Sequence, residues 1–182
     1  MVYALDPAND GAMIWEQRAG SGGTMGGIHY GLSANKDKLF VGVSDLPTAN
    51  PYNVGPAHPG IHAFKPSTGE ILWRNDLPDV CEPSVFLCWP GVSAAVSSTE
   101  DLVFAGGLDG MLRAFDVDDG KALWETNTRQ SFGLRNGIEA TGGSIESDGP
   151  VIVNGQVFIT SGYEKWGEAP GNVLLVYSLN GE

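Results

Sequence analysis

The chain is poor in basic residues. Its 182 residues include 10 lysines and arginines against 22 aspartates and glutamates, which gives a formal net charge of −12. A protein that binds nucleic acid needs a basic surface to hold the phosphates, so this balance argues against nucleic acid as a partner. We expect the acidic side chains to form a solubilising surface.

Long apolar runs are also absent. Nothing approaches the roughly 18 consecutive apolar residues of a membrane-spanning helix, so we expect no membrane span. The N-terminus, MVYALDPAND, lacks the basic start and the apolar stretch of a secretory signal peptide. Either the protein is cytosolic or the chain begins inside a longer one, and the repeats described below favour the second hypothesis.

Cysteine is scarce. The two cysteines, Cys81 and Cys88, enclose the loop CEPSVFLC. This spacing does not match a CxxC redox pair or a common zinc site, and the sequence contains no CxxCH haem motif. We favour a local disulfide, which would indicate an oxidising compartment, and two reduced thiols are the alternative.

What the chain does contain is apolar material and turn residues. Hydrophobic residues make up 42% of the sequence and charged residues 18%, which is enough for a folded core. The 26 glycines and 11 prolines are typical of many short strands joined by turns. No segment has the pattern of a helix of any length.

One motif recurs along the chain. A hairpin-like segment ends in tryptophan, with glycine four residues earlier, as in Gly120 and Trp124. Its copies are YALDPANDGAMIW (3–15), HAFKPSTGEILW (62–73) and RAFDVDDGKALW (113–124), and a fourth copy, LVYSLNGE (175–182), stops at the last residue. A period of about 50 residues is typical of propellers and solenoids.

Each repeat predicts four strands, the number in a propeller blade. The motif supplies the third and fourth. Expected first strands are 27–35, 91–99 and 149–155, and expected second strands are 38–45, 101–109 and 156–163. In the motif, we expect Ala114 to allow close approach of the next blade, Gly120 to supply a positive φ, and Trp124 to cover the gap between blades.

We therefore predict an all-β partial β-propeller, with about three and a quarter four-stranded antiparallel blades. The predicted pieces of this single domain are about 1–20, 21–78, 79–129 and 130–182. So few blades cannot close a ring in the range of about 4–8 blades. We expect both ends of the chain to expose unpaired strands, and the ring to be completed by N-terminal blades outside this chain.

The motif resembles the tryptophan-docking repeat of the pyrroloquinoline quinone (PQQ) dehydrogenases, Ala-x-Asp-x-x-x-Gly-x-x-x-Trp. LRAFDVDDGKALW matches it throughout, whereas the copy ending at Trp73 has Lys65 in place of the aspartate. Residues 102–177, which include NGIEATGGSIESDGP and SGYEKWGEAPGNVLL, are similar to the C-terminal part of polyvinyl-alcohol dehydrogenases.

This resemblance implies a C-terminal portion of a propeller of about eight blades. It also implies oxidation of alcohols by hydride transfer to PQQ near the central axis, often with Ca²⁺, and electron transfer to a cytochrome c. The implied location is the periplasm or the cell exterior, with a signal peptide upstream of this chain.

A PQQ site needs flat walls, donors for three carboxylates and oxygen ligands for a metal. In a propeller, loops entering the innermost strands supply them, and here these are residues 22–31, 81–93 and 129–144. We expect Trp89 or Tyr30 to stack on the cofactor and Arg135 to bind a carboxylate. The remaining candidates are His29 and Asn136. The alternatives are that Trp89 plugs a blade junction and that His29 is a hydrogen-bonded core histidine.

No catalytic residue or metal ligand can be assigned from the sequence. Asp45 and Glu139 lie near these loops, but we expect both in a solvated surface. The glycines at 22–27 do not form a dinucleotide-binding GxGxxG between a strand and a helix.

A second hypothesis is a binding module, because the same repeat builds cofactor-free propellers that act as assembly scaffolds or sensor domains. The long loop 129–144, with Arg135 and Asn136, favours the enzyme lineage. Glu16, Arg74 and Glu125 follow the tryptophans, and the period is too long for a WD-type blade. A kelch blade fits the Gly-to-Trp spacing less well.

Overall fold

The computed structural model describes residues 1–23, 25–45, 55–82, 88–133, 137–163 and 166–178. The regular structure in these residues is β, and no helix among them is long and apolar enough to cross a membrane. The strands are β1 (Val2–Asp6), β2 (Ala12–Gln17), β3 (Leu32–Ala34), β4 (Leu39–Val43), β5 (Gly60–Phe64), β6 (Ile71–Asp76), β7 (Ser97–Ser98), β8 (Leu102–Gly106), β9 (Met111–Asp116), β10 (Ala122–Asn127), β11 (Ser131–Gly133), β12 (Glu139–Thr141), β13 (Val151–Val153), β14 (Gln156–Ser161) and β15 (Val173–Ser178).

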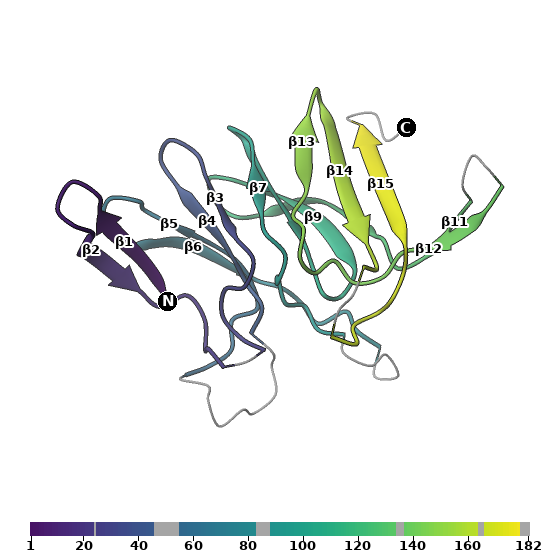
Figure 1. Cartoon of the computed structure of the whole chain (residues 1–182), viewed down its shortest axis with the longest axis horizontal. Coiled ribbons are helices and arrows are strands. Elements are labelled where there is room, and N and C mark those ends of the chain that lie inside the picture. The colour runs from purple at the N-terminus through teal and green to yellow at the C-terminus, as the bar shows by residue number, and fades with distance from the viewer. Residues whose placement is uncertain (24, 46–54, 83–87, 134–136, 164–165, 179–182) are drawn as a thin grey trace.

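The strands form successive antiparallel sheets. Two sheets have four strands, β3-β4-β5-β6 and β7-β8-β9-β10, and a third has the order β13-β14-β15. The hairpin β1–β2 precedes them, and Figure 1 shows these sheets side by side in chain order. The predicted all-β fold, a partial propeller of four-stranded antiparallel blades, is confirmed.

The first strand of each blade is shorter than predicted. β3, β7 and β13 span two or three residues each. The residues before them bond across to the next blade, as where Tyr30 N donates to Ser93 O over 3.3 Å. The hairpin β11–β12 was not predicted from the sequence, and it lies within the predicted loop 129–144.

The motif forms the third and fourth strands of each blade. Its alanine pairs across the hairpin with its tryptophan, in Ala4–Trp15, Ala63–Trp73 and Ala114–Trp124. The turn glycines Gly11, Gly69 and Gly120 have φ values of 74°, 74° and 72°. The positive φ predicted for this position is therefore confirmed in three copies.

Tryptophan docks each blade on the next. Trp15 Nε1 donates to Pro66 O over 2.8 Å, and Trp73 Nε1 donates to Val117 O over 3.0 Å. Both acceptors lie in the turn of the following blade's motif. The predicted role of these tryptophans in covering the gap between blades is confirmed at these two junctions.

The docking tryptophan lies directly against the glycine of the next turn. A Cβ added to Gly69 would lie 2.5 Å from Trp15, and one added to Gly120 would lie 2.4 Å from Trp73. At the third junction, Trp124 contacts Tyr177 edge-on with 5.3 Å between ring centroids. Gly181, which aligns in the sequence with Gly69 and Gly120, lies outside the described residues.

The hydrophobic core consists of layers between neighbouring blades. One layer joins Phe40 and Ile61 to Val103 and Phe115. The next layer packs Leu112 of β9 and other residues of its blade against the following sheet. An equivalent layer lies between β1–β2 and the sheet of β3–β6. Burial thus fixes the blades relative to one another and places their first strands together on one side.

Candidate functional site

The segments that lead into the first strands converge closely. A Cβ added to Gly31 would lie 3.0 Å from Ala95 Cβ, and one added to Gly149 would lie 2.3 Å from Ala95 O. Only small residues fit at such an approach. We name residues 27–31, 91–95 and 144–149 the axial segments, because the first strands of propeller blades surround the central channel.

Equivalent hydrogen bonds set the register of the axial segments. In each blade, an amide just after the second strand donates to the carbonyl that starts the segment. The pairs are Ser44 N to Gly27 O at 2.8 Å, Leu108 N to Gly91 O at 2.9 Å, and Gly162 N to Ser144 O at 2.9 Å. His29, Ser93 and Glu146 each follow such a carbonyl by two residues, so they occupy equivalent positions in three consecutive blades.

These three side chains form a continuous polar row. His29 Nδ1 lies 2.8 Å from Ser93 Oγ, and Ser93 Oγ donates to Glu146 Oε1 over 3.5 Å. Ser93 and Glu146 are buried, at 2% and 7% exposure, whereas His29 is exposed. The row therefore runs from solvent at His29 into the interior. We call it the axial relay.

Tyr30 lies beside the exposed end of the relay. Its side chain is 47% exposed, and its ring lies edge-on to that of His29 with 6.4 Å between centroids. An exposed phenol ring next to an exposed imidazole is compatible with stacking on a planar ligand. The prediction that His29 and Tyr30 contact a cofactor stays a prediction.

Trp89 has a different environment. Its side chain is 3% exposed, and its Nε1 donates to Ser44 O over 2.9 Å. A Cβ added to Gly91 would lie 2.4 Å from this nitrogen. The indole therefore packs at the junction of two blades, as the alternative interpretation of this residue expected. Its contact with a cofactor stays a prediction.

Arg135 and Asn136, the remaining predicted site residues, lie outside the described residues. The strands on either side of them are described. β11 and β12 pair through Ser131–Thr141, Phe132–Ala140 and Gly133–Glu139. The predicted carboxylate-binding role of Arg135 stays a prediction.

The two cysteines are joined. Cys81 and Cys88 form a disulfide with their Cα atoms 5.7 Å apart. Arg129 Nη1 lies 3.2 Å from Cys88 Sγ, so the disulfide loop contacts the segment that precedes β11. The disulfide favoured from the sequence is thus present in the structure.

The expectation that Asp45 lies in a solvated surface is wrong. Its carboxylate is 0% exposed and accepts amide hydrogens from Ser21 at 2.7 Å, Gly27 at 2.7 Å and His58 at 3.0 Å. Burial acts to raise the pKa of Asp45, but the hydrogen bonds from these amides outweigh it and lower the pKa. Asp45 thus ties two loops to the end of β4. Glu139 is exposed as expected.

The described residues match only part of a PQQ site. Tyr30 offers an aromatic face and His29 offers a ring nitrogen, but the predicted cation, Arg135, is not among them. Among the described residues, no group of three His, Cys, Asp or Glu side chains is placed to hold a metal ion. Any calcium site of the family would need residues beyond this described set.

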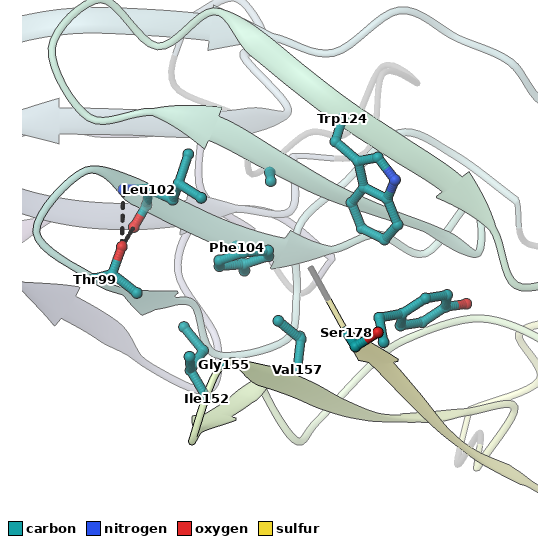
Figure 2. Close-up of a pocket in the computed structure, with 10 residues that line it drawn as sticks. Thr99, Leu102, Phe104, Trp124, Ile152, Gly155, Val157 and Ser178 are labelled. Carbon is teal, nitrogen blue, oxygen red and sulfur yellow. Dashed lines mark hydrogen bonds between the residues drawn. The ribbon is translucent and has the colours of Figure 1, made fainter. Parts of the chain in front are cut away.

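A cavity of about 440 Å³ lies elsewhere, between the sheets of β7–β10 and β13–β15. Figure 2 shows Phe104, Trp124 and Val157 pointing into it from the two facing sheets. The side chains lining it are mainly apolar, and none of the described ones is charged. A tricarboxylate needs cationic partners, so this cavity does not fit PQQ.

Tryptophan-docked, four-stranded antiparallel blades define the class of protein as part of a β-propeller. The chain belongs to the PQQ-repeat propeller family, which includes the PQQ-dependent dehydrogenases. The family model described as "Outer membrane protein assembly factor BamB" matches residues 1–135 and 82–175.

Known relatives and structures agree with this family. The chain is 37% identical to a polyvinylalcohol dehydrogenase of Pseudomonas sp and 36% identical to that of Sphingopyxis sp. (strain 113P3), over 100% of the chain in both cases. It spans 29% of the length of each enzyme. The crystal structure of BamB from Moraxella catarrhalis matches 99% of this chain and 44% of that one, with a TM-score of 0.60 and 17% identity, which supports the fold alone.

Sequence reasoning missed two members of the axial relay, Ser93 and Glu146. The signal was present, because both occupy the position of His29 in later repeats. It becomes visible only when the repeats are aligned through their inter-strand hydrogen bonds, since the first strands vary more than the tryptophan motif.

Proposed function

We propose that this chain forms the C-terminal part of the propeller of a PQQ-dependent alcohol dehydrogenase of the polyvinyl-alcohol type. The observation that carries the proposal is 37% and 36% identity to two polyvinylalcohol dehydrogenases along the whole chain. Because the chain spans 29% of each relative, it contributes to the enzyme's activity together with other blades.

Within such an enzyme, bound PQQ supplies a quinone that accepts a hydride from the alcohol carbon. This chain would contribute one side of the axial mouth. Tyr30 would form part of a flat wall, His29 would present a ring nitrogen, and Arg135 with Asn136 would bind carboxylates. Asp45 would keep the loop containing His29 and Tyr30 in place.

The proposal extends to the compartment and the electron acceptor. The disulfide between Cys81 and Cys88 supports an oxidising compartment, for which we propose the periplasm. The resemblance to PQQ dehydrogenases supports a cytochrome c as the acceptor.

A cofactor-free scaffold or sensor propeller is the second candidate. It is favoured by the family model, whose description names an outer-membrane assembly factor, and by the BamB structure. A scaffold would have no need of the axial relay. The two functions differ in whether the axial residues take part in alcohol oxidation.

A segment exchange tests the proposal. The part of the Pseudomonas polyvinylalcohol dehydrogenase that aligns with this chain is replaced by residues 1–182, and PQQ-dependent oxidation of polyvinyl alcohol is measured with an artificial electron acceptor. We expect the chimera to retain activity within about tenfold of the parent. A tenfold loss corresponds to a rise of about 1.4 kcal/mol in the activation free energy, and a shared axial geometry should keep the rise within that limit.

The matched control exchanges the corresponding segment of Moraxella catarrhalis BamB into the same enzyme. It has the same fold, and we expect it to abolish activity. A folded chimera with residues 1–182 that binds PQQ but oxidises no alcohol would contradict the enzyme proposal and support the scaffold.

The isolated chain should not bind PQQ tightly. It contributes only some of the blades that would surround the cofactor, and its described residues hold no metal-binding group of three side chains. Titration of the chain with PQQ and Ca²⁺, followed by the absorbance of the quinone, is expected to show no saturable binding in the micromolar range. Saturable micromolar binding would show that this chain carries most of the site.

A further inference from the structure

We propose that the disulfide between Cys81 and Cys88 is a site of thiol–disulfide exchange with a small external thiol, which attacks Cys81 while Cys88 departs as a thiolate beside Arg129. The two sulfur atoms have opposite electrostatic surroundings, and this difference gives the reaction its direction. The inference goes beyond the proposed function and does not depend on it.

Arg129 supplies a positive charge at Cys88. Its Nη1 lies 3.2 Å from Cys88 Sγ, and a guanidinium group stays charged in folded proteins. Among the residues that the structure describes, Arg129 forms no ion pair with a carboxylate. Its charge is therefore available to stabilise a thiolate at Cys88, and a more stable thiolate is a better leaving group.

Packing holds the Arg129 side chain in this position. A Cβ added to Gly110 would lie 2.2 Å from Arg129 Cγ and 2.4 Å from its Cδ, so the aliphatic part of the side chain lies directly on the turn between β8 and β9. The Arg129 amide also donates to Asn127 Oδ1 over 2.8 Å. Contacts within one blade thus place the guanidinium against the disulfide before the bond opens.

Cys81 has acidic neighbours instead. Its amide donates to Asp79 Oδ1 over 3.0 Å, and Glu82 follows it in the chain. Both acidic side chains are exposed, and exposed carboxylates carry negative charge at neutral pH. Like charge destabilises a thiolate, so Cys81 is the poorer leaving group of the pair and the sulfur that an external thiol attacks.

The residue after Cys88 keeps that end of the bond in place. Trp89 is 3% exposed, and its Nε1 donates to Ser44 O over 2.9 Å at the blade junction. Next to Cys81, in contrast, Val80 is 52% exposed and Glu82 is exposed. Opening the disulfide therefore frees the Cys81 end, while Cys88 stays anchored beside Arg129.

The exchange conserves atoms and electrons. An external thiolate forms a bond to Cys81 Sγ, the bond between Cys81 and Cys88 breaks, and its electron pair leaves on Cys88 Sγ. A second external thiolate then attacks the external sulfur of this mixed disulfide and releases Cys81 as a thiolate. Two external thiols are oxidised to their disulfide, and the protein disulfide is reduced by two electrons. Both cysteines are partly exposed, so a small thiol can reach the bond.

The direction of the exchange is tested on the full, folded chain. The chain is treated briefly with β-mercaptoethanol without denaturant, free thiols are blocked with N-ethylmaleimide, and the peptides are mapped by mass spectrometry. We expect the β-mercaptoethanol adduct on Cys81 and the maleimide on Cys88. An adduct on Cys88, an even distribution over the two cysteines, or no reduction without denaturant would overturn the proposal.

The role of Arg129 is tested by substitution. Arg129→Met keeps a long side chain but removes the charge, so we expect severalfold slower reduction and a weaker preference for Cys81. Arg129→Lys should keep most of both properties, because it keeps the positive charge. The wild-type mapping tests the direction of the exchange whether or not Arg129→Met folds.

The matched control is Lys121→Met. It makes the same change in net charge at an exposed residue in the turn between β9 and β10, so it should react like the wild-type chain. If Arg129→Met reacted like wild type, or if both methionine variants were slowed equally, the direction of exchange would not come from Arg129 and the proposal would be overturned.

Discussion

The buried carboxylate of Asp45 makes the stability of its loops depend on pH. Its pKa lies below the ordinary value of 3.8, because amide hydrogen bonds outweigh the effect of burial. A lowered folded-state pKa means that the carboxylate stabilises the fold fully above pH about 4, and that this contribution is lost as pH falls below that value. The contribution of Asp45 to stability therefore changes only at acidic pH, well below neutrality.

Asp45→Asn tests this contribution. The amide nitrogen of asparagine would face at least one of the three donating amides, so we expect a loss of about 1–3 kcal/mol in the free energy of unfolding at pH 7. Denaturant unfolding at pH 7 and pH 3 measures it, and the difference from wild type should narrow at pH 3. Asp101→Asn, at an exposed aspartate, is the control. An equal difference at both pH values would contradict the assignment.

His62 makes a second, separate pH dependence. It is 0% exposed, and neither ring nitrogen has a hydrogen-bond partner among the residues that the structure describes. Asp76 Oδ1 lies 3.6 Å from Nε2. Burial, followed by the charge of Arg74, lowers the pKa of His62 from 6.5 to about 4. The unfolded chain therefore takes up a proton before the folded one does, and stability falls as pH drops from 6.5 toward 4.

His62→Leu should remove this dependence. Leucine has no polar atom to desolvate, so we expect a gain of about 1 kcal/mol in the free energy of unfolding at pH 7. The gain should rise by up to about 3 kcal/mol more near pH 4. Chemical denaturation across this range checks the result. A variant with the same pH profile as wild type would show that another group is responsible.

The turns of the repeated hairpins allow the effect of backbone strain on stability to be separated from the effect of tryptophan packing. Gly11, Gly69 and Gly120 share nearly the same positive φ, but only the last two lie against a tryptophan of the preceding blade. Around Gly11, no described residue other than its chain neighbours comes within 4 Å of the position where a Cβ would lie. Substitution by alanine thus adds backbone strain at all three and a collision at two.

We expect Gly11→Ala to cost about 1 kcal/mol in the free energy of unfolding, which is the cost of a left-handed alanine. Gly69→Ala and Gly120→Ala should cost about 1–3 kcal/mol more, because each would displace a docked indole. Thermal and denaturant unfolding measure all three. Equal losses at the three positions would show that the glycine is kept for its φ alone and not for docking.

The sequence predicts local, repeated features of this protein better than contacts between distant residues. The motif containing Ala114, Gly120 and Trp124 is local and periodic, so it predicts the hairpin, the bladed fold and the docking. The environment of Asp45 depends on amides 24 residues before it, 18 before it and 13 after it. The axial relay joins residues 64 and 53 positions apart. These contacts join segments of different blades or loops far apart in the sequence, so the local tryptophan motif does not predict them.

The chain as a whole presents apolar surface at both ends of its row of sheets. On β1 and β2, Tyr3, Leu5 and Met13 are 54%, 57% and 58% exposed, and at the other end Leu174 of β15 is 61% exposed. Within the described residues, β1 pairs only with β2 and β15 only with β14. Unpaired strands with apolar side chains are sites of association, either with further blades or with another copy of the chain.

We therefore expect the isolated chain to self-associate as its concentration rises. The net charge of −12 opposes this, so association should strengthen when salt screens the repulsion between copies. Sedimentation velocity at low and high salt measures the effect. Leu5→Lys with Met13→Lys, which are cross-strand partners on β1 and β2, should reduce association severalfold.

The control variant, Leu72→Lys with Leu123→Lys, makes the same change in charge on the fourth strands of the interior blades. These leucines are also exposed, at 40% and 53%, but they lie on β6 and β10, away from the ends of the row. It should therefore associate much as the wild-type chain does once the added charge is screened at high salt. If both double variants lowered association equally at high salt, net charge would account for the effect. If the wild-type chain stayed monomeric at every salt concentration, the exposed ends would not be association surfaces. The partial propeller would then need no partner to cover them.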